Sequence, residues 1–102
     1  MAPRYAHRFT KIQALMAEKN LDLLVVVNRE NLIYFTGLTQ IECLAVLIPR
    51  EGEPCAVTFW LDAEYVQREA GLTTYGYIFP KESLGSKLVE RIKAYGFGAP
   101  RI

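Results

Sequence analysis

The feature that most constrains the fold is the apolar run from Leu21 to Val27, which leads directly into a short segment ending at Gly37. The run is valine-rich and too short for a typical helix, so it predicts a strand buried on both faces. Asn28 then offers an N-cap oxygen, and Glu30 lies favourably in the first helical turn. Gly37 can close that helix in the left-handed conformation. A buried strand followed at once by a short capped helix favours a layered α/β fold.

The segments on either side of this unit also show clear periodicity. Apolar residues at helical spacing predict an amphipathic first helix, which Asn20 ends by adopting a left-handed conformation; these residues are Tyr5, Phe9, Ile12, Leu15 and Met16. The runs Cys43–Pro49 and Cys55–Trp60 are β-rich and are separated by a polar segment containing Gly52. They predict an antiparallel hairpin.

The second half of the chain alternates again between helix and strand. Asp62 is expected to cap a helix that runs through Ala70, with a strand following over Thr74–Phe79. Ser83 is expected to cap a last helix, whose apolar stripe is Leu84, Leu88, Ile92 and Tyr95. The element order predicts an α/β fold over residues 1–102, a three-layer α/β/α sandwich with a mixed sheet. Another strand is expected at Ala99–Ile102, so the chain is interpreted as a fragment of a longer protein.

Composition excludes several classes of function. The formal net charge of the 102 residues is +1, without a dense basic cluster, so no nucleic-acid or membrane-surface partner is predicted. The longest apolar run is far shorter than the roughly 20 residues of a membrane span, and the amino terminus lacks the apolar region of a signal peptide. Cys43 and Cys55 are predicted to be buried free thiols, which fits a reducing cytoplasm.

The sequence contains few side chains that could act in catalysis. The one histidine, His7, is expected on the surface of the first helix, and Ser83 and Ser86 are expected to act in helix capping. We predict no catalytic, cofactor-binding or metal-binding residue. The alternating aromatic residues Tyr75 and Tyr77, with Phe79, are interpreted as core or interface packing, because no basic residues are interleaved to make a nucleic-acid stacking platform.

Two polar side chains stand out in the segment Asn31 to Gly37. Asn31 is expected to bond to local backbone, and Tyr34 to bury its ring with its hydroxyl paired. The loop that follows, Leu38 to Glu42, is the best place for exposed recognition groups, which here are Gln40 and Glu42.

The sequence also resembles a known protein family. NLIYFTG, Asn31 to Gly37, is similar to the Asn-Ile-x-Tyr-Leu-Thr-Gly element found in the N-terminal domain of the creatinase, prolidase and aminopeptidase P group. The segment Arg8 to Asn31 resembles that family's opening helix, turn and first strand. Glu42 to Phe59 resembles its β-hairpin. The resemblance covers nearly the whole chain, and the heptapeptide is its most specific part.

The resemblance implies a mixed sheet of ribonuclease H-like topology and a partner catalytic domain. Such parents carry a C-terminal domain of pita-bread fold with two divalent metals (Mn, Co or Zn), held by two aspartates, one histidine and two glutamates. That domain cleaves the peptide bond before proline, or performs metal-free hydrolysis in creatinase. The matching segment is absent here, so none of those ligands can be assigned to this chain.

The resemblance also implies a role for the domain itself. In cytoplasmic Xaa-Pro peptidases of this group the N-terminal domain serves dimerisation and covers the active site, so a homodimer is expected. By analogy, the candidate contacts to a neighbouring subunit's substrate pocket are Tyr34, Phe35, Gln40 and Glu42. The alternatives are a peptidase-like binding domain without catalysis, as in a histone-chaperone subunit, and a stand-alone α/β module.

Overall fold

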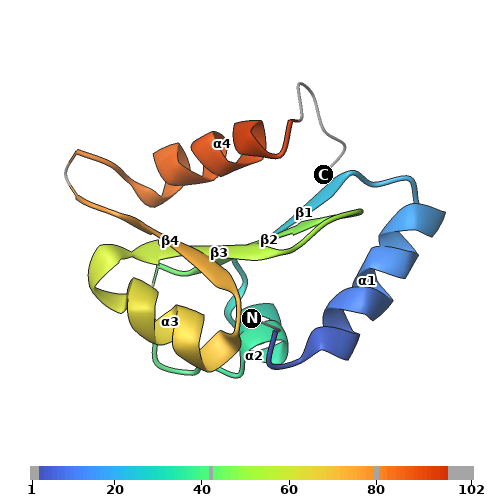
Figure 1. Ribbon diagram of the computed structural model, residues 1–102, viewed down its shortest axis with the longest axis horizontal. Helices are drawn as coiled ribbons and strands as arrows, with labels where there is room; N and C mark the ends of the chain where they lie inside the picture. Colours follow the sequence, from blue (N-terminus) through green and yellow to red (C-terminus); the bar gives the residue numbers. More distant parts are fainter. Residues whose placement is uncertain (1–2, 42, 80, 97–102) are drawn as a thin grey trace.

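The structure, a computed structural model, describes residues 3–41, 43–79 and 81–96. Within these residues the elements run in the order shown in Figure 1. They are α1 (Ala6–Glu18), β1 (Leu23–Val26), α2 (Arg29–Thr36), β2 (Ala45–Pro49), β3 (Cys55–Phe59), the 3₁₀ helix η1 (Trp60–Asp62), α3 (Ala63–Ala70), β4 (Thr73–Tyr77) and α4 (Leu84–Ala94). No helix in these ranges is long and apolar enough to cross a membrane.

The described strands form one mixed sheet in the order β1-β2-β3-β4. β1 pairs antiparallel with β2, with Leu23 opposite Pro49, and β2 pairs antiparallel with β3. β4 then pairs in parallel with β3, with Phe59 opposite Tyr77. β1, β3 and β4 therefore run in one direction and end at the same side of the sheet.

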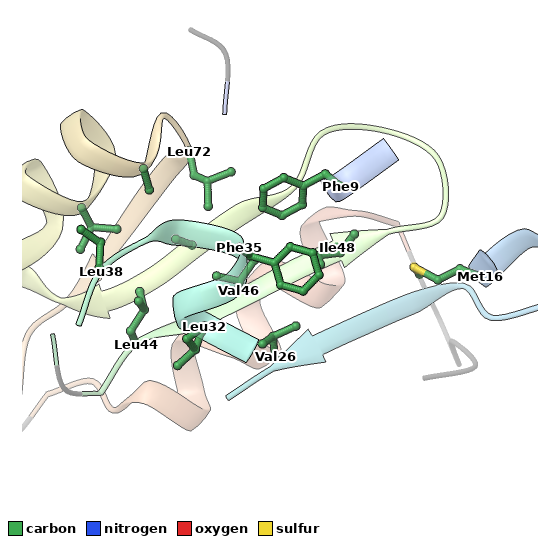
Figure 2. Close-up of a cluster of buried hydrophobic side chains, with 13 residues drawn as sticks. Phe9, Met16, Val26, Leu32, Phe35, Leu38, Leu44, Val46, Ile48 and Leu72 are labelled. Atoms are coloured by element: carbon green, nitrogen blue, oxygen red, sulfur yellow. The ribbon is translucent and has the colours of Figure 1, made fainter. Parts of the chain in front are cut away.

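Helices cover both faces of this sheet, which confirms the predicted three-layer α/β/α architecture (Figure 1). The first three helices lie on one face. Their core includes a tilted stack of Phe9 from α1 on Phe35 from α2, with ring centroids 4.9 Å apart (Figure 2). The core's buried strand residues on this face are Val26, Val46, Ile48 and Ala56. Alternation along each strand sends neighbouring side chains to the opposite face.

Among the described elements, α4 covers the opposite face of the sheet. Sheet residues Leu23, Leu47, Cys55, Val57 and Tyr77 pack against the predicted stripe of Leu84, Leu88, Ile92 and Tyr95. The Tyr95 hydroxyl oxygen lies 2.9 Å from the Glu53 carbonyl oxygen and 3.2 Å from the Cys55 sulfur, and its single proton is shared between these two acceptors. These bonds fix the last turn of α4 over the β2–β3 turn.

The residues that cap the helices were predicted correctly where the capping residue lies within a few positions of the helix end it stabilises. The Asn28 side chain accepts from the Asn31 backbone N–H, and Gly37 ends α2 in the left-handed conformation. Ser83 caps α4 and exchanges hydrogen bonds with Ser86 in a capping box. Asn20 has a φ of 56°, as expected for the residue that ends α1.

The prediction that both cysteines are buried was wrong for Cys43. Cys43 is exposed and has a φ of 54°, in the left-handed region. Strand β2 therefore begins only at Ala45, because a left-handed residue cannot continue the extended chain. Cys55 is buried, as predicted.

The predicted side-chain cap by Asp62 was also wrong. Asp62 already has helical backbone angles because it is the last residue of η1, and its side chain makes no capping bond. The chain turns at Trp60, so Trp60 lies in η1 and outside β3.

Exposure differs from the prediction at two side chains, because Leu15 is 43% exposed and Tyr34 is 45% exposed. Phe79 is 69% exposed because it lies beyond the end of β4, so it does not pack in the core, and interface packing stays a prediction. The predicted strand at Ala99–Ile102 lies outside the described residues.

Candidate functional site

Helix α2 carries two of the candidate residues, Tyr34 and Phe35, and is held firmly at its carboxyl end. The Gly37 N–H donates to the Ile33 carbonyl at 2.7 Å, and Gly37 has a φ of 74°. A Cβ at Gly37 would lie 2.9 Å from the Tyr5 hydroxyl oxygen. The left-handed backbone therefore favours glycine, whereas the Tyr5 side chain could move away from an added Cβ.

Arg8 joins α1 to α2 at the surface. Its guanidinium carbon lies 4.1 Å from the Tyr5 ring centroid and 4.4 Å from that of Tyr34. The same guanidinium donates a hydrogen bond to the Tyr34 carbonyl. A cation placed between two aromatic faces is attracted by both ring quadrupoles, so Arg8 holds Tyr34 in a defined position.

A groove of about 380 Å³ runs between α1 and α2, and we call it the α1–α2 groove. Its lining residues are Arg8, Lys11, Ile12, Ala14, Leu15, Glu18, Tyr34 and Phe35. The surface is mostly apolar, with two cationic side chains and one carboxylate on α1. Such a groove suits an apolar group from another molecule, and it contains no pairing of a nucleophile with a base.

The structure separates the predicted site residues by role. Tyr34 is half-exposed in the α1–α2 groove, whereas Phe35 is only 5% exposed. The Phe35 ring meets the Tyr34 ring edge-on at 5.1 Å, so it supports Tyr34 from the core. Gln40 is exposed in the loop after α2, and Glu42 lies outside the described residues.

The loop after α2 lies beside a different hollow from the α1–α2 groove. Arg29 donates to the Thr39 carbonyl at 2.9 Å, and the Leu38 N–H donates to Thr36 Oγ1 at 3.1 Å. These bonds position the loop beside a second hollow of about 310 Å³, lined by Val27, Arg29, Leu32, Leu38, Thr39, Ile41, Cys43, Leu44 and Leu84. Tyr34 does not line this hollow, so the described candidates do not form one pocket.

The perturbed titratable groups near the sheet are held in their protonated forms. Burial, followed by interaction with Cys43, raises the pKa of Tyr77 to about 12. Burial also raises the pKa of the Cys55 thiol, although the hydrogen bond from Tyr95 acts in the opposite direction and lowers it. Burial raises the pKa of Tyr95 as well. A thiol that keeps its proton is a poor nucleophile, so Cys55 is a packing residue.

Comparison with known proteins identifies the family. The family model of the creatinase/prolidase N-terminal domain matches residues 8–101. The chain belongs to this creatinase/prolidase N-terminal domain family. A comparison with curated proteins gave no match.

Solved structures share this family fold at low sequence identity. The N-terminal domain of an Xaa-Pro dipeptidase from Lactobacillus brevis is 18% identical with a TM-score of 0.78, covering 91% of this chain and 71% of that one. The N-terminal domain of the cytoplasmic peptidase PepQ from Mycobacterium tuberculosis is 20% identical with a TM-score of 0.74, covering 90% and 68%. A proline dipeptidase from Streptococcus pneumoniae is 18% identical with a TM-score of 0.70. The match covers 89% of this chain and 65% of the length of that protein.

The family's catalytic metals do not fit the part of this domain that the structure describes. Across residues 3–41, 43–79 and 81–96, no group of three or more histidine, cysteine, aspartate or glutamate side chains could hold a metal ion. A dinuclear site needs several convergent carboxylate or imidazole ligands. We therefore derive no catalytic step from these residues.

Sequence reasoning named Tyr34 and Phe35 but missed Arg8, the residue that links Tyr34 to α1. Arg8 and Tyr34 are 26 positions apart, so no local pattern links them. A usable signal was present at the start of α1, where Tyr5, the residue before the helix, stands three positions from Arg8, close to the spacing of neighbours on a helix surface.

Proposed function

We propose that this chain is the non-catalytic N-terminal domain of a larger Xaa-Pro metallopeptidase, of the dipeptidase or aminopeptidase P type. In this role it promotes dimerisation and covers the active site of a C-terminal catalytic domain. The observation that carries the proposal is the agreement between the family match over residues 8–101 and the fold shared with N-terminal domains of Xaa-Pro dipeptidases.

The division of labour follows from the residues of this domain. Two divalent metals in the catalytic domain would supply an activated water for peptide hydrolysis. This domain would contribute apolar and polar surface that shapes the pocket entrance and excludes water from it. The name of the similar M. tuberculosis protein, a cytoplasmic peptidase, supports a cytoplasmic location for the parent.

Three side chains are the candidates for the covering role. Tyr34 is exposed yet fixed by the Arg8 guanidinium and by the edge of Phe35. Gln40 is exposed on the loop after α2, and Glu42 follows it in sequence. A rigid aromatic side chain and, on a separate loop, adaptable polar groups suit two distinct contacts with a peptide substrate.

An assay of hydrolysis tests the non-catalytic assignment. The homogeneous 102-residue chain is mixed with Mn²⁺ or Co²⁺ and Xaa-Pro dipeptides, with the S. pneumoniae proline dipeptidase as the positive control. We expect no proline release by the chain. Turnover that co-purifies with the chain would refute the assignment.

The covering role is tested in a full-length protein that contains this domain. Tyr34→Ala and the pair Gln40→Ala with Glu42→Ala should raise KM for Xaa-Pro substrates, because each removes a contact at the pocket entrance. Unchanged KM and an unchanged oligomeric state would contradict the covering role. A C-terminal domain without two aspartates, one histidine and two glutamates would favour the peptidase-like binding protein instead.

A further inference from the structure

The charged side chains that line the α1–α2 groove follow a definite order along α1. Arg8 lies in the first turn of the helix and Lys11 in the next turn, whereas Glu18 is the last helical residue. Lys11 and Glu18 are seven positions apart, which corresponds to about 10.5 Å along a helix axis. The groove therefore has a cationic end and an anionic end, separated by about two helical turns.

Helix stability does not explain this order of charges. The helix macrodipole favours acidic residues in the first turn and basic residues in the last turn, and α1 has neither. Across the part of the chain that the structure describes, the side chains of Lys11 and Glu18 also have no ion-pair or hydrogen-bond partner. Both charges are therefore available to a molecule that enters the groove.

The groove is apolar between its two charged ends. Ile12 and Leu15 from α1 line this part together with Tyr34 from α2, and Leu15 and Tyr34 are 43% and 45% exposed. Tyr34 is already fixed, because the Arg8 guanidinium carbon lies 4.4 Å from its ring centroid. The groove volume of about 380 Å³ lies within the range of roughly 300–1,000 Å³ found for small-molecule sites. The groove thus offers a formed apolar surface to a small ligand.

We propose that the α1–α2 groove binds a short zwitterionic peptide of about three residues with apolar side chains. An extended chain spans at most about 3.3–3.6 Å per residue, so three residues cover about 10–11 Å, the separation of the two charged ends. The peptide carboxylate lies at Arg8 and Lys11, and its α-ammonium lies at Glu18. Arg8 can take part because a guanidinium presents five N–H donors, and its bond to the Tyr34 carbonyl uses one of them.

An NMR titration of the 102-residue chain with the tripeptide Ala-Leu-Ala tests the site. The backbone amide signals of α1 and of Tyr34 should shift and saturate with a Kd of roughly 0.1–1 mM, as expected for a ligand of this size. Added salt should weaken the binding, because it screens exposed charges. The absence of saturable shifts at about 10 mM peptide, or shifts confined to other surfaces, would refute the site.

Matched double variants test the two charged ends. Lys11→Gln with Glu18→Gln removes one charge from each end and leaves the net charge unchanged. The Kd should rise about threefold for each lost contact, and so about tenfold for the pair. The control is Lys93→Gln with Glu64→Gln, which removes exposed charges from α4 and α3 and should leave the Kd unchanged. The dispersion of the amide signals shows that each variant is folded. Equal Kd values for the two double variants would refute recognition by charge.

Modified peptides test whether the ligand must be zwitterionic and of this length. Glu18 is the only carboxylate among the described residues that line the groove, so N-acetylation of Ala-Leu-Ala should weaken its binding to wild type about threefold. The same acetylation should have no effect on binding to Glu18→Gln. An unchanged Kd with wild type would mean that the groove selects an apolar anion, and the zwitterion would be refuted. The dipeptide Ala-Leu spans only about 7 Å and should bind more weakly than the tripeptide; equal affinity would refute the length.

The outcomes separate this proposal from the proposed function. Peptide binding in the groove requires neither a catalytic domain nor a dimer, so it goes beyond the covering role. Xaa-Pro hydrolysis by the chain would refute the non-catalytic assignment and leave these titrations unaffected, because Ala-Leu-Ala contains no proline. A chain that neither binds the tripeptide nor hydrolyses Xaa-Pro substrates would refute the peptide site and support the non-catalytic assignment.

Discussion

Replacement of Gly76 by alanine should destabilise the protein, although alanine normally improves a strand. The new Cβ would lie 2.8 Å from the Trp60 Cα, 3.2 Å from the Trp60 Cβ and 3.4 Å from the Ala63 Cβ. The first atom belongs to the backbone, so it cannot move away by rotating a side chain. Overpacking of this kind costs about 1–3 kcal/mol, and alanine returns roughly 0.5–1 kcal/mol through chain entropy. Because the clash is with backbone, the cost lies in the upper part of that range, about 2–3 kcal/mol, and subtracting roughly 1 kcal/mol leaves a net loss of about 1–2 kcal/mol.

The effect is measured by thermal and urea unfolding followed by circular dichroism. For a domain of this size, about 1–2 kcal/mol corresponds to a Tm lowered by roughly 4–16 °C. All variants are compared at one low protein concentration, because dimer formation would itself raise the Tm. Trp60 fluorescence should also change, since the substitution displaces that residue.

Gly85→Ala is the matched control. Gly85 lies in the first turn of α4, and beyond the adjoining backbone the nearest atom to a Cβ there would be the Ser83 Oγ, at 3.9 Å. The same chemical change should therefore raise stability by roughly 0.5–1 kcal/mol. If Gly76→Ala were neutral or stabilising, the close approach of η1 to β4 would be refuted.

Three further changes test other parts of the structure. Ser83→Ala should cost about 1 kcal/mol in urea unfolding, because it removes the capping box of α4. Hydrogen bonding to Lys87 lowers the pKa of the Glu82 carboxyl in the folded protein. The ionised Glu82 therefore stabilises the fold above the ordinary carboxyl pKa, and this stabilisation is lost as the pH falls through the lowered pKa of the folded state. The stability difference between Glu82→Gln and wild type should consequently shrink on acidification, and a constant difference would contradict the pairing. A thiol reagent should modify Cys43 rapidly and Cys55 only slowly, because Cys55 is buried and its pKa is raised; equal rates would show that the burial is wrong.

The fold was predictable where the deciding signals are local. The Asn28 and Ser83 caps bond to groups three positions away, at Asn31 and Ser86, so a short stretch of sequence contains both partners. The position of strand β1 was predictable from its continuous apolar run, but the prediction that it is buried on both faces was wrong. β1 lies at the edge of the described sheet, so Leu24 and Val25 are only half-buried and Val27 is 58% exposed.

The errors arose where tertiary contacts decide the local structure. Asp62 has the right residue type for a cap, but the preceding 3₁₀ turn gives it helical backbone angles. That turn packs on β4 through Gly76, sixteen positions from Trp60, which no window of local sequence contains. Cys43 lies in an apolar run, yet its left-handed backbone leaves it exposed.

The candidate site was predictable only in part. Tyr34 and Gln40 are exposed as a contact role requires, although the notion that Tyr34 buries its ring was wrong. The position of Tyr34 depends on Arg8 in another helix. Its exposure follows from how α1 packs against α2, which the helical pattern of either segment alone does not define.

The unequal covering of the two sheet faces has a consequence for how the molecule opens. One face is covered by the first three helices, but the other is covered by α4, which has no fully buried residue among those described. Strand β2 is buried at every position. We therefore expect amide hydrogen exchange to reveal two units, with α4 detaching in sub-global openings and β2 exchanging only when the whole domain unfolds. Each detachment of α4 would bare Leu47, Val57 and Tyr77, so the lifetime of that partly open form would govern the tendency of this chain to aggregate.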